Sequence, residues 1–574
     1  MLKIENLSYA FPQKELYNEI SFTLEEGQHC AFIGISGSGK STLIDLILDP
    51  ENYMYEGTLE LAPNCRTGYV SQFPSLEKTE GVTVLEYIGG ECIRLQKEID
   101  RLCAEMGTTS DIESVLEKYQ EALDAFEALG GNDFESNISK KLNLANLMNH
   151  KDSMVSDLSG GEFKLVQVIK EMLNNPDLLI MDEPDVFLDF ENLNALKNLI
   201  NTHKGTLLVI THNRYLLNHC FNKIIHLENM ELQEFDGTYI DYNFSLLQGK
   251  IELQEIAADE AEEIKRNQIL VDKLRKAATD HDVAAKGKKL KARVKMQERL
   301  EARRVKAPFV AIKQPNIRLN TYNEIEETVA LKVTDLTLAF DEVLLENINF
   351  EINSNEKVAI IGSNGTGKTT LLKEIFKNSN PSIEVNENIE MAYLSQVQGE
   401  MLNEGNTIME EFHDTALRNS DEIKVHLSRY GFEEDLLNQK IGSLSGGEKN
   451  ILQLAKVATT KANLLLLDEP TSHLDTYSQL ALEKALENYN GAILMISHDF
   501  YSIVNCMDYV LIIEDKSIRK MKMKKFKRMI YAEHFDKDYL EIEQKKKAME
   551  TKIAQALENN DFEGAKVLCE ELEP

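Results

Sequence analysis

The stretch LSGGE at residues 444–448 is followed, twenty residues later, by DEPTSHLD at 468–475, and the rest of the sequence is organised around this pair. The apolar residues 464–467 come directly before the second stretch and predict a short strand that is buried on both faces. A strand of this kind ends at the carboxyl edge of a parallel sheet. It therefore delivers two adjacent carboxylates, Asp468 and Glu469, to that edge.

A glycine-rich loop lies upstream of this pair. Residues 362–369 read GSNGTGKT and match the pattern G-x-x-x-x-G-K-[ST], after the strand-like residues 357–361 and at the start of a helical pattern. The glycines let backbone N–H groups close around phosphate oxygens, and the helix that follows adds its positive N-terminus. The loop therefore predicts a nucleotide-phosphate site.

The same module occurs twice. Residues 2–11 resemble 331–340, and GISGSGKS at 34–41 matches 362–369 with an offset of 362 − 34 = 328. Short apolar runs separated by helical patterns predict an α/β fold for each copy. The first copy has predicted strands 31–35, 178–181 and 207–210 with the motifs Ser71-Gln72, LSGGE 158–162, Asp182-Glu183-Pro184 and Thr211-His212; the second has Ser395-Gln396 and Ser497-His498.

This order of motifs resembles the nucleotide-binding domain of ABC ATPases, and DEPTSHLD is similar to the DEPTNHLD-type loop of the ABC-F family. The resemblance implies an α/β fold with two tandem ABC-type P-loop ATPase domains, a long helical-hairpin linker and a small helical C-terminal extension. The expected domains are 1–241 (first ABC domain, with a helical arm at about 91–130), 242–325 (basic helical linker), 326–530 (second ABC domain) and 531–574 (C-terminal extension).

Composition narrows the class of protein. No run in the 574 residues approaches the roughly 18 to 20 apolar residues that a membrane helix needs, and the N-terminus enters a strand pattern without signal-peptide architecture. The seven cysteines are scattered without a C-x-x-C pair, which favours a reducing cytosol over a metal site or a disulfide frame. A net charge of −33 opposes nucleic-acid binding unless basic residues are segregated.

The first copy carries an insertion. Gln72 and Leu158 are 86 positions apart, whereas Gln396 and Leu444 are 48 apart, so about 38 extra residues lie near 93–129. Their charge and helical spacing predict a helical hairpin. In the ABC-F family an insertion here is the arm, which contacts the ribosomal surface; a merely decorative hairpin is the alternative.

Between the copies, residues 247–278 predict a helix of about 30 residues, or about 45 Å, and a second helix runs to about residue 304. Segregated positive charge supplies salt-dependent affinity for nucleic acid, although a solvated charged helix is the alternative. The resemblance places this hairpin toward tRNA and the peptidyl-transferase region of the ribosome, and so favours RNA contact. The basic residues of the second helix are Lys286, Lys288, Lys289, Lys291, Arg293, Lys295, Arg299, Arg303, Arg304 and Lys306.

The motifs predict ATP and Mg²⁺ as ligands. The loop lysines would reach the β- and γ-phosphates, and a hydroxyl after each lysine would bind Mg²⁺ together with the Asp of each DEP motif. The predicted nucleotide-binding residues are Gly34, Ser36, Gly37, Gly39, Lys40, Ser41, Thr42, Gln72, Ser159, Gly160 and Gly161, with Gly362, Asn364, Gly365, Gly367, Lys368, Thr369, Thr370, Gln396, Ser445, Gly446 and Gly447. The predicted metal ligands are Ser41, Gln72, Asp182, Thr369, Gln396 and Asp468.

Glu183 and Glu469 would polarise the attacking water as bases, and His212 and His498 would bond the γ-phosphate. A structural acid cluster and structural histidines are the alternatives. Phe11 and Phe340 are candidates to stack on adenine, or are core aromatics.

The resemblance also implies composite sites, in which the phosphate loop of one copy faces the LSGGE signature of the other. The first copy reads Asp185-Val186-Phe187 where the second reads Thr471-Ser472-His473. Because the glutamates and histidines occur in both copies, both sites are expected to be competent, but equal turnover is in doubt.

The expected function is that of a cytoplasmic ABC-F ATPase that binds the ribosome in its ATP-closed state and acts on the P-site tRNA and peptidyl-transferase region. Resistance to ribosome-binding antibiotics is favoured by the long linker and modest arm, and a housekeeping translation factor that relieves stalled ribosomes is the alternative. The ATPase subunit of a membrane exporter and a DNA-repair ATPase are rivals from other classes. With two copies in one chain, a monomer without a membrane partner is expected.

Overall fold

The computed structural model describes residues 1–11, 14–72, 81–106, 112–128, 130–186, 188–277, 293–296, 315–319, 328–339, 343–417, 419–534 and 539–572. The chain divides into two compact units: 1–236 with 314–530, and 237–313 with 531–574. The first unit holds both copies of the predicted module. The exact domain boundaries given above stay a prediction.

The first copy is built on a six-stranded sheet of order β5-β6-β7-β3-β8-β9, parallel except at β9, and a three-stranded antiparallel sheet of order β2-β1-β4. The central strands β6 and β7 are buried at every residue, as short apolar runs between helices require. The strands are β1 (Leu2–Phe11), β2 (Lys14–Leu24), β3 (His29–Gly34), β4 (Glu56–Leu61), β5 (Thr67–Val70), β6 (Leu178–Asp182), β7 (Thr206–Ile210), β8 (Lys223–Glu228) and β9 (Glu231–Asp236).

The second copy repeats this plan with the sheet β14-β15-β16-β12-β17-β18, parallel except at β18, and the smaller antiparallel sheet β11-β10-β13. The matching strand orders confirm two tandem α/β modules. The strands are β10 (Val329–Ala339), β11 (Val343–Asn353), β12 (Lys357–Ile361), β13 (Ile383–Val385), β14 (Met391–Leu394), β15 (Leu464–Asp468), β16 (Ala492–Ile496), β17 (Tyr509–Glu514) and β18 (Ser517–Lys522).

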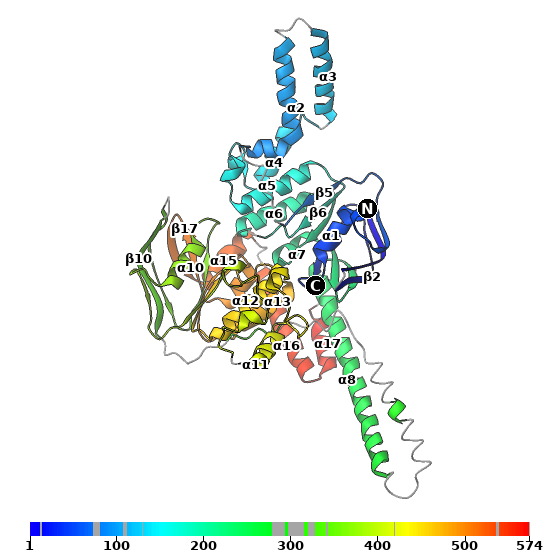
Figure 1. Cartoon of the computed structure of the whole chain (residues 1–574), viewed down its shortest axis with the longest axis vertical. Coiled ribbons are helices and arrows are strands. Elements are labelled where there is room, and N and C mark those ends of the chain that lie inside the picture. The colour runs from blue at the N-terminus through cyan, green and yellow to red at the C-terminus, as the bar shows by residue number, and fades with distance from the viewer. Residues whose placement is uncertain are drawn as a thin grey trace. The chain divides into compact units, whose positions relative to one another are not determined.

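The helices pack around these sheets (Figure 1). The helices of the two modules, apart from those of the insertion in the first copy, are as follows. In the first copy they are α1 (Lys40–Leu48), α4 (Phe134–Leu144), α5 (Gly160–Leu173), α6 (Phe190–Thr202) and α7 (Arg214–Cys220); in the second, α10 (Lys368–Lys377), α11 (Ser420–Arg429), α12 (Gly446–Thr460), α13 (Thr476–Glu487), α14 (Phe500–Cys506) and α15 (Met523–His534).

The insertion of the first copy forms a hairpin of α2 (Val84–Met106) and α3 (Ile112–Ala128), which lie side by side (Figure 1). Leu95, Ile99 and Phe126 belong to a hydrophobic cluster between the two helices. Helix α2 is kinked at Gly90, whose φ of 37° and ψ of −108° are not helical, and the kink separates the hairpin from the body of the module. The insertion therefore has the helical form that its spacing predicts.

The second unit contains α8 (Tyr239–Ala277), α16 (Tyr539–Glu558) and α17 (Phe562–Glu570). Helix α8 begins eight residues before the predicted Leu247, because Thr238 and Asp241 form a reciprocal cap in which each side chain accepts from the other's backbone N–H. Its 39 residues span about 58 Å rather than 45 Å.

A small core joins α8 to the C-terminal helices. Ile251 packs with Ile553, Ala565 and Cys569, and Lys566 forms an ion pair of 2.6 Å with Glu255. The C-terminal helices therefore brace the first linker helix. Most of the predicted basic second linker helix lies outside the described residues, which include only Arg293 and Lys295 of its ten named cations.

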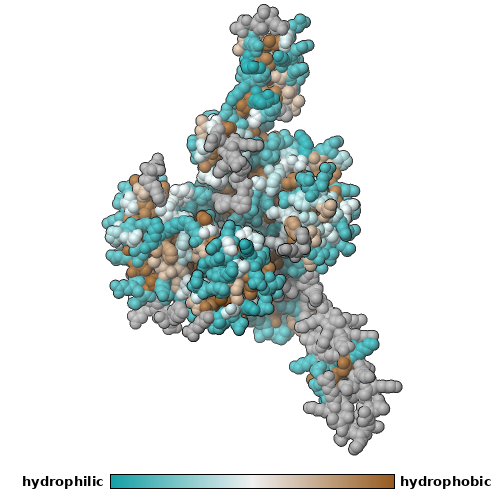
Figure 2. Space-filling view, viewed as in Figure 1, coloured by the Kyte–Doolittle hydropathy of each residue, from teal (hydrophilic) through white to brown (hydrophobic). Residues whose placement is uncertain are grey.

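None of the described helices has the length and apolar content to cross a membrane. On the face shown in Figure 2, the arm hairpin carries mainly hydrophilic residues with single hydrophobic ones between them. All seven cysteines are described and none forms a disulfide.

Candidate functional site

Each phosphate loop is closed by its own lysine. Lys40 Nζ donates to the carbonyls of Gly34 and Ile35, both at 3.0 Å, and Lys368 Nζ donates to Gly362 and Ser363 at 2.7 and 2.8 Å. Burial lowers the pKa of both lysines. The two ammonium groups are thus held at the mouth of a loop of backbone donors, as a phosphate site requires.

The glycine before each lysine is needed for its backbone conformation. Gly39 and Gly367 have φ of 100° and 89°, in the left-handed region. A β-carbon at Gly39 would also lie 2.9 Å from Tyr17 Oη, and this buried tyrosine donates to the Gly39 carbonyl. Tyr17 was not singled out by the sequence, in which it reads only as a strand residue.

The two DEP motifs place their carboxylates at the carboxyl ends of β6 and β15. Glu183 and Glu469 have φ of 43° and 49°, which is unusual for a residue with a side chain. Their N–H groups donate to Ile210 and Ile496 of the neighbouring strand, each at 2.9 Å. Strain of this kind persists where the surroundings over-determine it, and it clusters at functional sites.

The aspartates fit a divalent cation. Burial raises the pKa of Asp182 and Asp468 to about 6, although a bond from Ser41 or Thr369 opposes this. Asp468 Oδ1 is buried without a hydrogen-bond partner among the described residues. Carboxylate and hydroxyl oxygens suit Mg²⁺, which commonly binds one or two carboxylates together with substrate phosphates. The described residues contain no cluster of three or more His, Cys, Asp or Glu that could hold a metal ion.

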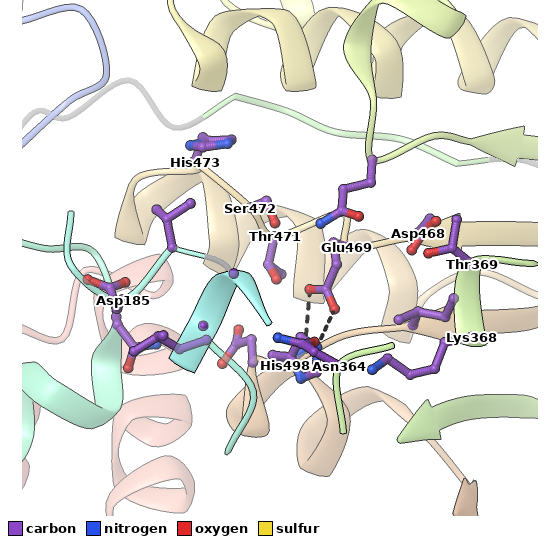
Figure 3. A pocket seen from close by; sticks show the side chains of 18 of the residues that line it. Asp185, Asn364, Lys368, Thr369, Asp468, Glu469, Thr471, Ser472, His473 and His498 are labelled. Atoms are coloured by element: carbon purple, nitrogen blue, oxygen red, sulfur yellow. Dashed lines mark hydrogen bonds and ion pairs between the residues drawn. The ribbon is translucent and has the colours of Figure 1, made fainter. Parts of the chain in front are cut away.

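The two glutamates have different surroundings. Glu183 accepts from Gln72 Nε2, and its Oε2 lies 3.5 Å from Nδ1 of His473 in the other copy. Burial raises the pKa of Glu183, but the bond with His473 and the charge of Lys40 outweigh this and hold it at about 2. Glu469 instead accepts from the backbone N–H of His498 at 3.2 Å (Figure 3), and burial raises its pKa to about 7.

The histidines after β7 and β16 are neutral at pH 7, because burial lowers the pKa of His212 and of His498 to about 4. His212 Nε2 is buried and has no hydrogen-bond partner among the described residues. His498 Nε2 lies 3.5 Å from Glu469 Oε1. A buried ring nitrogen without a hydrogen-bond partner is unusual, so His212 Nε2 can form a hydrogen bond with a ligand.

The LSGGE motifs form the N-terminal caps of two helices. Ser159 and Ser445 are the N-caps of α5 and α12, and Glu162 and Glu448 return the bond from the third helical position as a capping box. The two glycines between them are the first helical residues. A β-carbon at Gly447 would lie 2.3 Å from Ser36 Oγ, so this signature packs directly on the phosphate loop of the other copy.

A cavity of about 620 Å³ lies between the second phosphate loop and the first signature. Figure 3 shows Lys368, Thr369, Asp468, Glu469 and His498 at this cavity. Of the residues predicted from the sequence, it gathers Ser159, Gly160, Gly161, Glu183, His212, Asn364, Gly365, Gly367, Lys368, Thr369, Thr370, Gln396, Asp468, Glu469 and His498.

The loops after the DEP motifs link the copies reciprocally. Asp475 Oδ2 accepts from the N–H of Ser36 at 3.5 Å, and Asp189 Oδ2 accepts from the N–H of Asn364 at 3.3 Å. Ser36 and Asn364 are equivalent positions, since 364 − 36 = 328. The two aspartates also cap α13 and α6. The sequence showed them only as the last residues of two loops.

A buried ion pair between the copies was also missed. Arg214 of α7 contacts Glu483 of α13 and lies 2.8 Å from Asp499. Its guanidinium also lies 4.9 Å from the ring centre of Tyr501. Its only signal in the sequence is a charged residue two positions after His212, where the second copy has Phe500.

The remaining predicted residues are placed as follows. Phe11 is 46% exposed and so is not a core aromatic, and its stacking on adenine stays a prediction. Phe340 lies outside the described residues, as does Phe187. Thr42 bonds with Tyr17, and Gly446 packs against His473.

Comparison with known proteins gives the family. A family profile described as "ABC transporter" matches residues 17–186 and 345–472, more than half of the chain. The chain is 31% identical over 518 residues to "Uncharacterized ABC transporter ATP-binding protein YfmM" of Bacillus subtilis (87% of this chain, 96% of the relative). It is 30% identical over 539 residues to "ABC transporter F family member 2" of Arabidopsis thaliana (90% of this chain, 76% of the relative).

Among solved structures, an archaeal ABCE1, described as a ribosome recycling factor in complex with the ribosomal stalk protein aP1, aligns with a TM-score of 0.54 and 18% identity, over 92% of each chain. At this identity the likeness concerns the fold, a tandem pair of ABC modules. The duplicated sheets, the paired motifs and these relatives together show that the chain belongs to the ABC ATP-binding family and, within it, to the ABC-F group.

Proposed function

We propose that this protein hydrolyses ATP at two composite sites. Each site pairs the phosphate loop of one copy with the LSGGE signature of the other. The observation that carries the proposal is that each phosphate loop faces the signature of the other copy. Gly447 packs against Ser36 at the first site, and Ser159 and Lys368 line one cavity at the second. The reciprocal bonds from Asp475 and Asp189 support it, because they bring the loops of both sites together.

Substrate phosphates would replace the loop carbonyls as partners of Lys40 and Lys368. Asp182 with Ser41, and Asp468 with Thr369, would hold Mg²⁺ together with Gln72 and Gln396. The bound cation would neutralise charge on the phosphates. The raised pKa of each aspartate fits this role, because a carboxyl that burial keeps partly neutral can ionise beside a cation.

Glu183 and Glu469 would orient the attacking water and accept its proton, giving ADP and phosphate. His212 and His498 would bond a γ-phosphate oxygen as neutral rings. The orphaned Nε2 of His212 supports this role, since it lacks the bond that a phosphate oxygen would supply. Phe11 is exposed enough to stack on the adenine.

We further propose that the ATP-closed protein binds the ribosome and acts on the P-site tRNA and peptidyl-transferase region. Membership of the ABC-F group supports this, as does the run of ten cations in the predicted second linker helix. The described helices of the arm hold ten Asp or Glu against four Lys or Arg, so their charge favours a basic protein surface over RNA. The RNA contact is therefore assigned to the linker.

Two roles are open to such a protein: ribosome protection against antibiotics and a housekeeping function in translation. We propose ribosome protection, because the linker is long and the arm is modest in length. We propose a cytoplasmic monomer with intramolecular pairing of the two copies. Expression in a susceptible host should raise the inhibitory concentration of at least one ribosome-binding drug. Unchanged susceptibility across drug classes would instead favour a housekeeping translation factor.

The ribosomal part is tested by co-sedimentation of the Glu183→Gln/Glu469→Gln variant with 70S ribosomes. Removing both bases should trap the ATP-closed state, so the variant should pellet with ribosomes in ATP and stay in the supernatant in ADP. A Lys40→Ala/Lys368→Ala version of the same variant is the control, since it should not close. A variant that binds ATP but never pellets would overturn ribosome binding and direct the search to a membrane or DNA partner.

A further inference from the structure

The side chain of His473 reaches into the site of the other copy. Its Nδ1 lies 3.5 Å from Glu183 Oε2 and 3.5 Å from Gln72 Nε2, and Gln72 donates to the same carboxylate oxygen. Glu183 and Gln72 belong to the first copy, whereas His473 follows the DEP motif of the second. The orientation of the Glu183 carboxylate therefore depends on a residue of the opposite copy.

The backbone at His473 is held in place on several sides. Its φ of 61° is in the left-handed region, and its carbonyl accepts from Ser36 Oγ at 3.2 Å. Asn450 of α12 donates to the carbonyl of Ser472, the preceding residue, at 2.7 Å. A β-carbon at Gly446 would lie 3.3 Å from His473 Cγ. A strained residue that is fixed by this many neighbours fits a residue whose position matters.

The second site is arranged differently. Glu469 accepts from the backbone N–H of His498 of its own copy at 3.2 Å, whereas its Oε1, 3.5 Å from the His498 ring Nε2, has no hydrogen-bond partner among the described residues. The position equivalent to His473 in the first copy is Phe187, since 473 − 187 equals 475 − 189. A phenylalanine has no ring nitrogen to offer to a carboxylate.

We propose that His473 is a positioning residue for Glu183 in trans, so that the first site is set for hydrolysis only when the second copy's loop is seated against it. Among the residues that the structure describes, Glu469 takes its hydrogen bond from its own copy. Hydrolysis at the first site is thereby coupled to closure of the two copies. The inference rests on the proposed ATPase function and adds to it an inequality between the sites.

The test is a mutant cycle on ATP turnover with Mg²⁺. His473→Gly removes the ring, and His473→Asn restores a donor; both residues tolerate the left-handed backbone at this position, so the two variants differ in the side chain alone. His413→Gly is the matched control, because this histidine is exposed and lies outside the cavity lining. Each His473 variant is also combined with Glu183→Gln.

We expect His473→Gly to lower kcat about twofold or more, to the level of Glu183→Gln, with the KM for ATP changed by less than about twofold. The combination with Glu183→Gln should show no further loss, and His473→Asn should recover most of the activity. Losses that add, a rise in KM alone, or no recovery in His473→Asn would each overturn the inference. Absence of ATP hydrolysis by the unaltered protein would overturn the proposed function itself, which separates the two failures.

Discussion

Arg214 offers the sharpest test of how the two copies are joined. Its side chain is 10% exposed, and those of its partners Glu483 and Asp499 are 7% and 16% exposed. Burial lowers the pKa of Arg214, but the two carboxylates outweigh this and raise it above its ordinary value. Arg214→Met keeps most of the side-chain length and leaves two buried carboxylates without their cation.

Removing one partner of a buried ion pair costs about 3–5 kcal/mol, because a charge is left buried and uncompensated. Here the Ser502 hydroxyl, 3.0 Å from Glu483 Oε1 and 2.6 Å from Asp499 Oδ2, shares its one proton between the two carboxylates, and Asn505 donates to Glu483. These bonds remain in the variant and place the cost at the lower end, about 3 kcal/mol. Neutralising all three charges in Arg214→Met/Glu483→Gln/Asp499→Asn should leave a cost of about 1 kcal/mol or less, since no charge is then stranded.

Urea unfolding followed by far-ultraviolet circular dichroism measures these differences, and urea is chosen because guanidinium would screen the charges. The single variant should lower the midpoint of the transition that unfolds the paired copies, and the neutral triple variant should recover most of it. A cost below about 1 kcal/mol for Arg214→Met is the value of an exposed pair and would refute the buried contact. A triple variant as unstable as the single one would refute the electrostatic account.

Three further predictions concern the sites and the arm. Lys40→Ala should weaken ATP binding at the first site at least about tenfold, because a charge-assisted hydrogen bond contributes about 1.5–3 kcal/mol. Equilibrium binding of a fluorescent ATP analogue measures this effect. Unchanged affinity would contradict the role assigned to Lys40. Burial raises the pKa of Glu469 from 4.5 to about 7. The neutral carboxyl therefore adds to the free energy of unfolding fully below pH 4.5, and this contribution is lost as the pH rises through 7. Glu469→Gln without Mg²⁺ and nucleotide should therefore stabilise the protein by up to about 3 kcal/mol at pH 8 and hardly at pH 4.5, as judged by urea midpoints; an equal effect at both pH values would contradict this. Phe126→Ala should lower the free energy of unfolding of the arm by about 3 kcal/mol. Hydrogen exchange in α2 and α3 should become faster, and ATP turnover should not change. Unchanged exchange would show that the hydrophobic cluster of the arm does not stabilise the hairpin.

Much of the fold could be predicted because its signals are local. The apolar run 464–467 becomes β15, and residues 357–361 become β12, since a strand between helices in a parallel sheet is buried along its whole length. LSGGE starts α5 and α12 because its serine and glutamate satisfy the first N–H groups of a helix. The start of α8 was placed too late, because the cap of Thr238 and Asp241 was not recognised.

The two α/β modules, their phosphate loops and the paired carboxylates could be read from the chain alone, because hydrophobic period, capping and glycine conformation act over a few residues. The contacts between the copies are visible only in the folded protein: Ser36 with Asp475, Arg214 with Glu483, and His473 with Glu183. These partners lie hundreds of positions apart, and no spacing links them. They meet because two folded surfaces pack together, and that packing makes the two otherwise similar sites unequal.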